Sequence, residues 1–301
     1  MPQGPQVVVD ERAEIHEGEA AARRLEAERA RQARFYDPAQ GVARVDRARW
    51  EEAQRYEKHS WLVNSRRQAT DRNEYHRAQI AGYDALRGLT FARGIELGCG
   101  PFTNMRFILE VCGVREITLL DPLLNDYLRH RFCRYAGGRL GGLWGGGSSL
   151  LGLRHPLAYL RDRLNAYRIG GWHGRPVRLA ASMIEQYTAD APFDLVVMIN
   201  VIEHCQDAPA VFAKILELLR PGGVMVFGDR LYDAAQVQAL AAQLYDAGHP
   251  LRVDRRVINA FLDENFTRLH RSERAVRHVF RGVEQAGDEL YYIGRRRGHG
   301  D

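Results

Sequence analysis

Short apolar runs alternate with helix-like segments through the middle and end of this chain. The apolar runs at Arg93–Leu97, Glu116–Leu120, Val177–Ala181, Phe193–Asn200 and Val224–Phe227 predict buried strands. The segments Asn104–Val111, Leu123–Phe132, Pro209–Leu219, Ala234–Tyr245 and Arg255–Leu262 predict helices. A last run at Glu289–Gly294 predicts a closing strand. Strands separated by helices indicate an α/β fold with a doubly wound, mostly parallel sheet.

The same pattern divides the chain into parts. Residues 1–45 are rich in Ala, Glu and Arg, and predict a polar helical or partly disordered extension. Aromatic residues return in 46–92, which predicts a helical cap that ends in Ala78–Leu86. The core spans 93–230, and 231–301 complete the fold. A glycine-rich, loop-rich insertion at about 136–175 interrupts the core; we expect a mobile lid or substrate-contacting excursion there, or else a disordered loop.

A glycine turn follows the first strand of the core. Gly98 and Gly100 lack a Cβ, so the backbone can turn tightly there and approach a ligand closely. We expect the N-terminal amides of the following helix to point at that ligand. Asp121 ends the next strand, where an acid is placed to hydrogen-bond a pair of ribose hydroxyls. Strand, turn, helix and acid together predict a nucleotide-type binding site.

Composition narrows the class of protein. The chain has 301 residues with 45% hydrophobic content, which is enough to bury a full core. Its formal net charge of +5 is a mild excess, which argues against a dedicated nucleic-acid binder. Its four cysteines lack CxxC spacing, and no apolar run approaches the ~20 residues that span a bilayer. We therefore expect a cytoplasmic protein with reduced thiols and no membrane partner.

These residues together resemble the class I S-adenosylmethionine-dependent methyltransferases. The resemblance covers about residues 94 to 229 and lies in the order and spacing of a few motifs. The motifs are Glu96-x-Gly98-x-Gly100, Asp121, the strand Phe193–Val197 leading to Asn200-Val-Ile-Glu-His204, and Arg220-Pro-Gly-Gly223. Within the family, the chain is most similar to bacterial enzymes that methylate sugars, glycans or small natural products. The resemblance implies a seven-stranded Rossmann-like sheet and S-adenosylmethionine as cofactor.

The resemblance also implies which residues bind the cofactor. The glycine turn would contact its amino-acid moiety, the segment after the second strand its ribose, and the loop after the third strand its adenine. In this sequence the implied residues are Glu96, Gly98, Cys99, Gly100, Asp121, Pro122, Ser182, Met183, Ile184 and Asn200. Ser182 stands where many relatives carry Asp, and Phe102 replaces a third glycine, so we expect its ring to pack under the turn.

An alcohol that accepts a methyl group must lose its proton, so a base should lie at the carboxyl ends of the strands. His204 is the first candidate, and a structural histidine carries nearly equal weight. Asp229 could be a base or a metal ligand, or could cap the loop into the next helix. His249 could face the substrate, although a surface histidine is the commoner outcome. Glu203, Asp207 and Asp229 could bind magnesium, but we favour metal-free catalysis and assign no metal ligand.

The leading hypothesis is methyl transfer to a hydroxyl, in preference to an amine, of a saccharide or small natural product. One alternative is a cofactor-binding scaffold or regulatory protein of the same fold without transferase activity. A second is a NAD-type oxidoreductase, disfavoured because the turn lacks the third small glycine of a dinucleotide fingerprint. Base methylation of nucleic acid is disfavoured because no Asn/Asp-Pro-Pro-aromatic motif is present. The sequence leaves a homodimer open.

Overall fold

The computed structural model describes residues 36–37, 42–61, 76, 81–127, 177–243, 246–280 and 283–298, with single positions 23, 26, 27 and 30. The predicted insertion and most of the N-terminal extension lie outside these residues. A small hairpin of β1 (Tyr36–Asp37) and β2 (Val42–Ala43) precedes the helix α2 (Arg47–His59). Among the described helices, none combines the length and the apolar character needed to cross a membrane.

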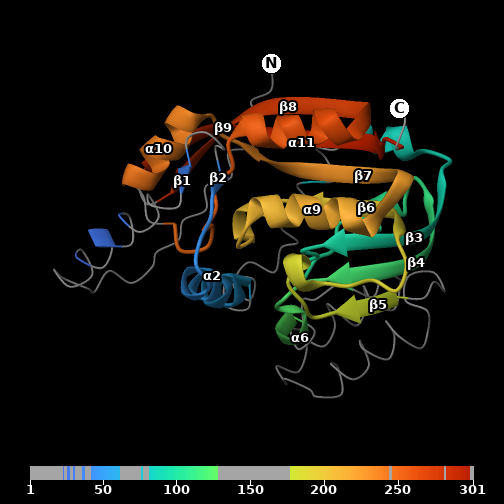
Figure 1. Ribbon diagram of the computed structural model, residues 1–301, viewed down its shortest axis with the longest axis horizontal. Coiled ribbons are helices and arrows are strands. Elements are labelled where there is room, and N and C mark those ends of the chain that lie inside the picture. Colours follow the sequence, from blue (N-terminus) through green and yellow to red (C-terminus); the bar gives the residue numbers. More distant parts are fainter. Residues whose placement is uncertain are drawn as a thin grey trace, which may run out of the picture.

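A seven-stranded sheet forms the centre of the molecule, in the order β5-β4-β3-β6-β7-β9-β8 (Figure 1). Its strands are β3 (Thr90–Leu97), β4 (Gly113–Leu120), β5 (Val177–Ala180), β6 (Phe193–Ile199), β7 (Leu219–Leu231), β8 (Phe266–Phe280) and β9 (Val283–Arg296). The pairs from β5 to β7 are parallel, whereas β9 is antiparallel to both β7 and β8. The predicted doubly wound, mostly parallel sheet is confirmed.

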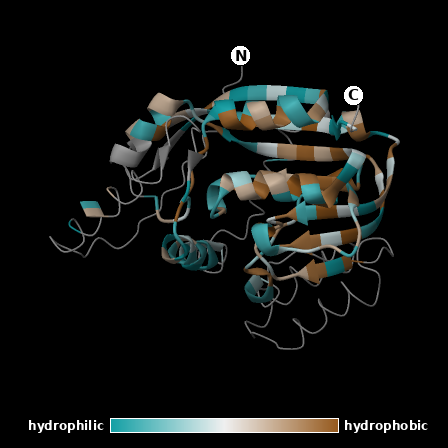
Figure 2. Cartoon of the chain, in the orientation of Figure 1, coloured by the Kyte–Doolittle hydropathy of each residue, from teal (hydrophilic) through white to brown (hydrophobic). Residues whose placement is uncertain are grey.

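The two faces of the sheet bury alternate residues of the same strands. In β6, Val196 and Met198 join one apolar core, while Leu195, Val197 and Ile199 join the other. Because both faces are covered, the strand is apolar at every position but Asp194, and it does not alternate between apolar and polar residues. In Figure 2 the central strands are largely hydrophobic (brown), whereas the helix α2 is largely hydrophilic (teal).

Helices cover both faces. On the face visible in Figure 1 lie α9 (Ala208–Leu218) and α11 (Arg255–Asn265), whose Phe212 and Phe261 rings stack with centroids 4.4 Å apart. The opposite core takes side chains from α5 (Met105–Ile108), α6 (Leu124–Tyr127) and the 3₁₀ helix η2 (Ala81–Leu86). A further helix, α10 (Ala234–Gln243), starts at a reciprocal cap in which Asp233 and Gln236 each accept the other's backbone N–H at 2.8 Å.

Besides the β1–β2 hairpin, the structure adds one strand to the large sheet that the hydrophobic pattern did not predict. β8 is the outer strand of the sheet, and none of its side chains from 267 to 277 is buried. Its residues therefore carry no apolar signal, and pairing with β9 along its whole length holds it in the sheet. The predicted helix at Asn104–Val111 is also shorter than expected, since only Met105–Ile108 is α-helical.

Candidate active site

The sheet has a switch point between β3 and β6. The chain leaves β3 for β4 and β5 on one side, then returns to β6 on the other. In open α/β sheets, ligands bind at the carboxyl ends of the strands at such a point. The predicted glycine turn lies there, directly after β3. Its residues Gly98 and Gly100 have φ of +67° and +54°, a left-handed conformation that favours glycine.

The two glycines serve different purposes. A Cβ on Gly98 would lie 2.5 Å from Val201 Cγ1, so this glycine lets the turn pack against the loop that follows β6. Among the described residues, a Cβ on Gly100 would meet no atom within 4 Å. Phe102, two residues after Gly100, is buried with its ring 5.8 Å from that of Trp61, and its packing under the turn stays a prediction.

Glu96 holds the glycine turn in place by accepting hydrogen bonds from the residues that follow it. Its buried carboxylate accepts hydrogen bonds from the backbone N–H of Asn104 at 2.8 Å and of Met105 at 3.1 Å, and from the Thr103 hydroxyl. The expectation that these helix-start amides point at a ligand is wrong, because Glu96 already satisfies them. Burial raises the pKa of Glu96 to about 7, against the hydrogen bonds that lower it.

We expect the contribution of the Glu96 carboxyl to the free energy of unfolding to fall as pH rises. Its pKa of about 7 in the folded chain lies above the ordinary 4.5, so the folded chain holds the proton more tightly than the unfolded chain. The contribution is therefore full below pH 4.5 and is lost as pH rises through about 7. Urea unfolding of the native chain and Glu96→Gln, between about pH 5 and 8, should show the native advantage shrinking with pH. An advantage that grows with pH would contradict this assignment.

Asp121 follows β4, and its side chain connects the end of this strand to the glycine turn. Its Oδ2 accepts from Gly100 N at 3.0 Å, and its Oδ1 from Leu123 N at 2.8 Å. The side chain is buried, and burial raises its pKa to about 6. Each carboxylate oxygen has a further lone pair, so the group can still accept from a ligand hydroxyl. The turn and the acid therefore fit a ribose-bearing cofactor: an open backbone cradle with an acceptor at its edge.

The other predicted cofactor residues lie along the same edge of the sheet. Asn200, directly after β6, has a φ of +58° and donates its backbone N–H to Gly228 O at 2.7 Å. Met183 and Ile184 are buried in an apolar core, and the Ser182 hydroxyl donates to Met183 O at 3.0 Å. Cys99 is fully buried, whereas Pro122 is half-buried. Their contacts with a cofactor stay predictions.

His204 and His249 come together, although they belong to different segments. His204 lies in the 3₁₀ helix η6 (Ile202–His204) after β6, and the two ring centroids are 4.6 Å apart. His204 Nδ1 donates to Gly248 O at 3.0 Å, and His249 Nδ1 to Asp246 Oδ2 at 2.8 Å. Neither acceptor carries a proton, so Nδ1 is the protonated nitrogen of each neutral ring. The second nitrogen, Nε2, therefore keeps its lone pair. Burial lowers the pKa of His204; in His249, Asp246 outweighs burial and raises the pKa.

Asp229 is an anchor for the loop after β6. Its buried carboxylate accepts from the backbone N–H of Val201 and Ile202, each at 2.9 Å, and of Arg230 at 2.9 Å. Burial raises its pKa to about 7. The cap of α10 is Asp233 rather than Asp229. A role for Asp229 as base or ligand stays a prediction.

The acidic cluster of Glu203, Asp207 and Asp229, considered from the sequence but not favoured, does not form. Glu203 is buried against Arg252 at 3.0 Å and Arg230 at 3.6 Å, and accepts from the Tyr232 hydroxyl at 2.9 Å. Asp207 caps α9, accepting from Ala210 N at 3.1 Å. Within the described part of the chain, these acids and Asp229 are not a group that could share one metal ion.

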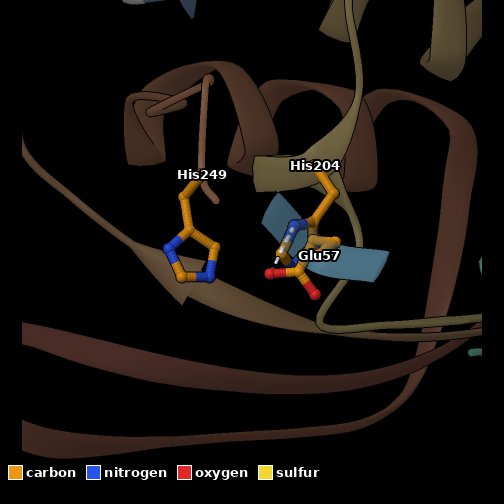
Figure 3. A group of neighbouring side chains, drawn as sticks. All are labelled: Glu57, His204 and His249. Carbon is orange, nitrogen blue, oxygen red and sulfur yellow. Dashed lines mark ion pairs between the residues drawn. The ribbon is translucent and has the colours of Figure 1, made fainter. Parts of the chain in front are cut away.

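Helix α2 lies across the carboxyl ends of the parallel strands, on the side to which β3, β4 and β5 point (Figure 1). Three contacts fix it there. Trp50 Nε1 donates to His204 O at 3.1 Å, Lys58 pairs with Asp126 at 2.8 Å, and Arg47 Nη1 contacts Met183 Sδ at 2.8 Å. This helix also brings Glu57 to the two histidines, as Figure 3 shows.

Comparison with known proteins identifies the family. The sequence model of the family described as "Methyltransferase domain" matches residues 54–271, which is most of the chain. The chain belongs to this family. The match confirms the predicted resemblance to S-adenosylmethionine-dependent methyltransferases and, with it, the predicted cofactor. No curated protein matches the sequence.

Solved methyltransferase structures are similar at low identity. The N-methyltransferase NodS from Bradyrhizobium japonicum WM9, in complex with S-adenosyl-L-homocysteine, is 17% identical with a TM-score of 0.48. That match covers 82% of this chain and 98% of NodS. The 1,6-didemethyltoxoflavin-N1-methyltransferase from Burkholderia thailandensis is 17% identical with a TM-score of 0.45, and the match covers 85% and 95% of the two chains. The family model, rather than these distant likenesses, identifies the family.

Two functional residues of this region were not predicted from the sequence. Asp246 fixes the His249 ring, and its position three residues before His249 was a usable signal. Glu57 lies on a helix far from the core motifs, and nothing in its neighbourhood marks it. Only the packing of α2 on η6 brings it to His204.

Proposed function

We propose that this methyltransferase transfers the methyl group of S-adenosylmethionine to a hydroxyl, in preference to an amine, of a saccharide or small natural product. The observation that carries the proposal is the glycine turn at the switch point. There Gly100 has a left-handed backbone, its Cβ position meets no atom of the described residues within 4 Å, and its N–H donates to the Asp121 carboxylate.

The cofactor would be held by backbone and carboxylate rather than by cationic side chains. Gly98 and Gly100 let the backbone approach its amino-acid end, and Asp121 accepts from its ribose hydroxyls. Asn200 and the segment 182–184 are the residues that we propose along the rest of the cofactor. When bound, S-adenosylmethionine supplies an electrophilic methyl carbon attached to a positively charged sulfur.

The acceptor side would lie by the histidines. In the transfer, a lone pair of the acceptor oxygen forms the new C–O bond, and the C–S bond breaks with its electrons moving to sulfur. The hydroxyl proton needs a base, and His204 has Nε2 free to take it because Nδ1–H is held by Gly248 O. Burial lowers the pKa of this imidazole, which favours its neutral, proton-accepting form.

Family membership supports the enzyme over the NAD-type oxidoreductase. A scaffold without transferase activity stays the main alternative, because a complete binding site does not by itself require turnover. Methyl transfer to an amine acceptor is the second alternative. The cytoplasmic location and the homodimer stay predictions from sequence.

Calorimetry with S-adenosylhomocysteine tests the cofactor site. We expect the native chain to bind it, and Asp121→Asn to weaken binding by about 1–3 kcal/mol, the scale of a lost hydrogen bond to a charged group. Asp84→Asn is the matched control, since Asp84 is exposed and pairs only locally with Arg87. A folded native chain that binds neither S-adenosylmethionine nor S-adenosylhomocysteine would contradict the proposal.

Methyl transfer is tested separately with labelled S-adenosylmethionine and matched panels of hydroxylated and amine acceptors. Label on oxygen supports the proposed acceptor, and label on nitrogen overturns it. Tight cofactor binding with no labelled product from any acceptor would favour the scaffold.

A further inference from the structure

Three potential metal ligands meet beneath α2, each from a different segment. Glu57 comes from α2, His204 from η6, and His249 from the segment 246–250; each offers a ligand atom, and these atoms all lie within 4.8 Å of one another. Figure 3 shows the three side chains pointing toward one another. Their side chains are 14%, 19% and 24% exposed, respectively, so the group is sheltered but open to a small ion. It is the one such group in the described part of the chain.

His249 is oriented as a metal-bound histidine usually is, whereas His204 presents Nδ1 to Glu57, 4.0 Å from its Oε1. A ligating histidine normally donates its other ring N–H to a carboxylate or a backbone carbonyl, which fixes the ring and the tautomer. His204 Nδ1 donates to the carbonyl of Gly248, and His249 Nδ1 to the carboxylate of Asp246. Asp246 is itself held by Arg252 at 2.5 Å. The outer partner of a metal site is thus present for His249.

The backbone around Glu57 is shaped to admit its carboxylate. A Cβ on Gly248 would lie 2.9 Å from both Glu57 Oε1 and Tyr56 Cδ1, so the glycine lets the segment pack closely against α2. Trp50 and Gln54, earlier on the same helix, donate to His204 O at 3.1 and 3.2 Å. These contacts fix α2 against η6 and hold the carboxylate beside the rings.

We propose that Glu57, His204 and His249 bind a divalent transition-metal ion such as Zn²⁺, Co²⁺ or Mn²⁺. Two imidazoles and one carboxylate are donors that suit these ions, whereas Mg²⁺ and Ca²⁺ prefer oxygen ligands throughout. Ligands at ~2.0–2.1 Å from one ion stand closer together than these three atoms, so the side chains contract around it by small rotations. Three protein ligands leave a coordination position open, as in catalytic sites.

Metal binding itself does not depend on methyl transfer; only the role of the metal rests on the proposed function. The ion would occupy the imidazole lone pairs, so His204 would cease to be the base. At its open position it would bind the acceptor hydroxyl and lower its pKa, which lets the proton leave to solvent.

The test is a titration of the chelator-stripped full chain with Co²⁺, followed by visible absorption and by calorimetry. We expect one ion per chain, with the absorption bands of nitrogen and oxygen coordination. His249→Gln and Glu57→Gln should each weaken Co²⁺ binding by at least about tenfold, since even outer-shell partners matter on that scale. The matched controls, His59→Gln and Glu51→Gln, are exposed on the same helix α2 and should bind as the native chain does.

Far-UV circular dichroism establishes that each variant is folded. No one-to-one Co²⁺ binding by the native chain, or equal binding by all four variants, overturns the inference. Calorimetry with S-adenosylhomocysteine on the metal-free chain keeps the two proposals apart. If that binding persists while Co²⁺ binding fails, the metal inference alone falls; if Co²⁺ binds but S-adenosylhomocysteine does not, the proposed function falls.

Discussion

Replacing Gly100 by alanine should weaken S-adenosylhomocysteine binding by at least about tenfold, or 1.4 kcal/mol. At this position the backbone lies beside Asp121, and a methyl group would project into the volume that the cofactor needs. Calorimetry on the folded variant measures the loss directly. The result would separate the backbone approach from the carboxylate, because Asp121 is unchanged.

Gly88 provides the control. It has a φ of +78°, and a Cβ there would also meet no atom of the described residues within 4 Å, but it lies before β3, at the opposite end of that strand. Alanine should therefore introduce a similar backbone strain, about 1–2 kcal/mol, at both positions. Only Gly100→Ala should lose cofactor affinity. Equal binding by the two variants would show that the cofactor does not approach this turn.

The parts of the fold that were predicted well are those in which burial decides the structure. β6 was predicted almost to its ends because both of its faces are covered, which makes Phe193–Ile199 apolar at every position but Asp194. β8 was missed for the opposite reason. Backbone pairing with β9 holds it along its length, and its exposed arginines and Glu273 leave no periodic signal.

The candidate site shows a similar division. The glycine turn and Asp121 were predicted because the backbone conformation and the strand end restrict which residues can stand there. The part played by Glu96 was not, since an acid next to a glycine turn can face a ligand or the turn itself. In the structure it faces the turn. Glu57 was beyond reach, because its place beside His204 depends on the docking of a whole helix.

Glu203 should be among the most costly single positions in the chain. Its side chain is 2% exposed and lies against two arginines, the buried Arg252 and the half-buried Arg230. Burial alone would raise the pKa of this carboxyl, but the arginines outweigh it and lower the pKa to about 2. Removing one partner from such a buried set costs about 3–5 kcal/mol, because the remaining charge is left without compensation. We expect about 3 kcal/mol for Glu203→Gln, since Arg252 keeps Asp246.

Glu217→Gln is the matched control for urea unfolding. Glu217 pairs with Lys214 at 2.6 Å, but its side chain is 57% exposed, so the loss should stay below about 1 kcal/mol. The pH dependence gives a second check. The contribution of Glu203 is present above its ordinary pKa of 4.5 and is lost as pH falls through about 2, so the gap between native and variant should narrow in acid. A loss no larger than that of Glu217→Gln would mean that Glu203 does not hold Arg252 in place. Arg252 in turn contacts Asp246, so the orientation of His249 would then need another support.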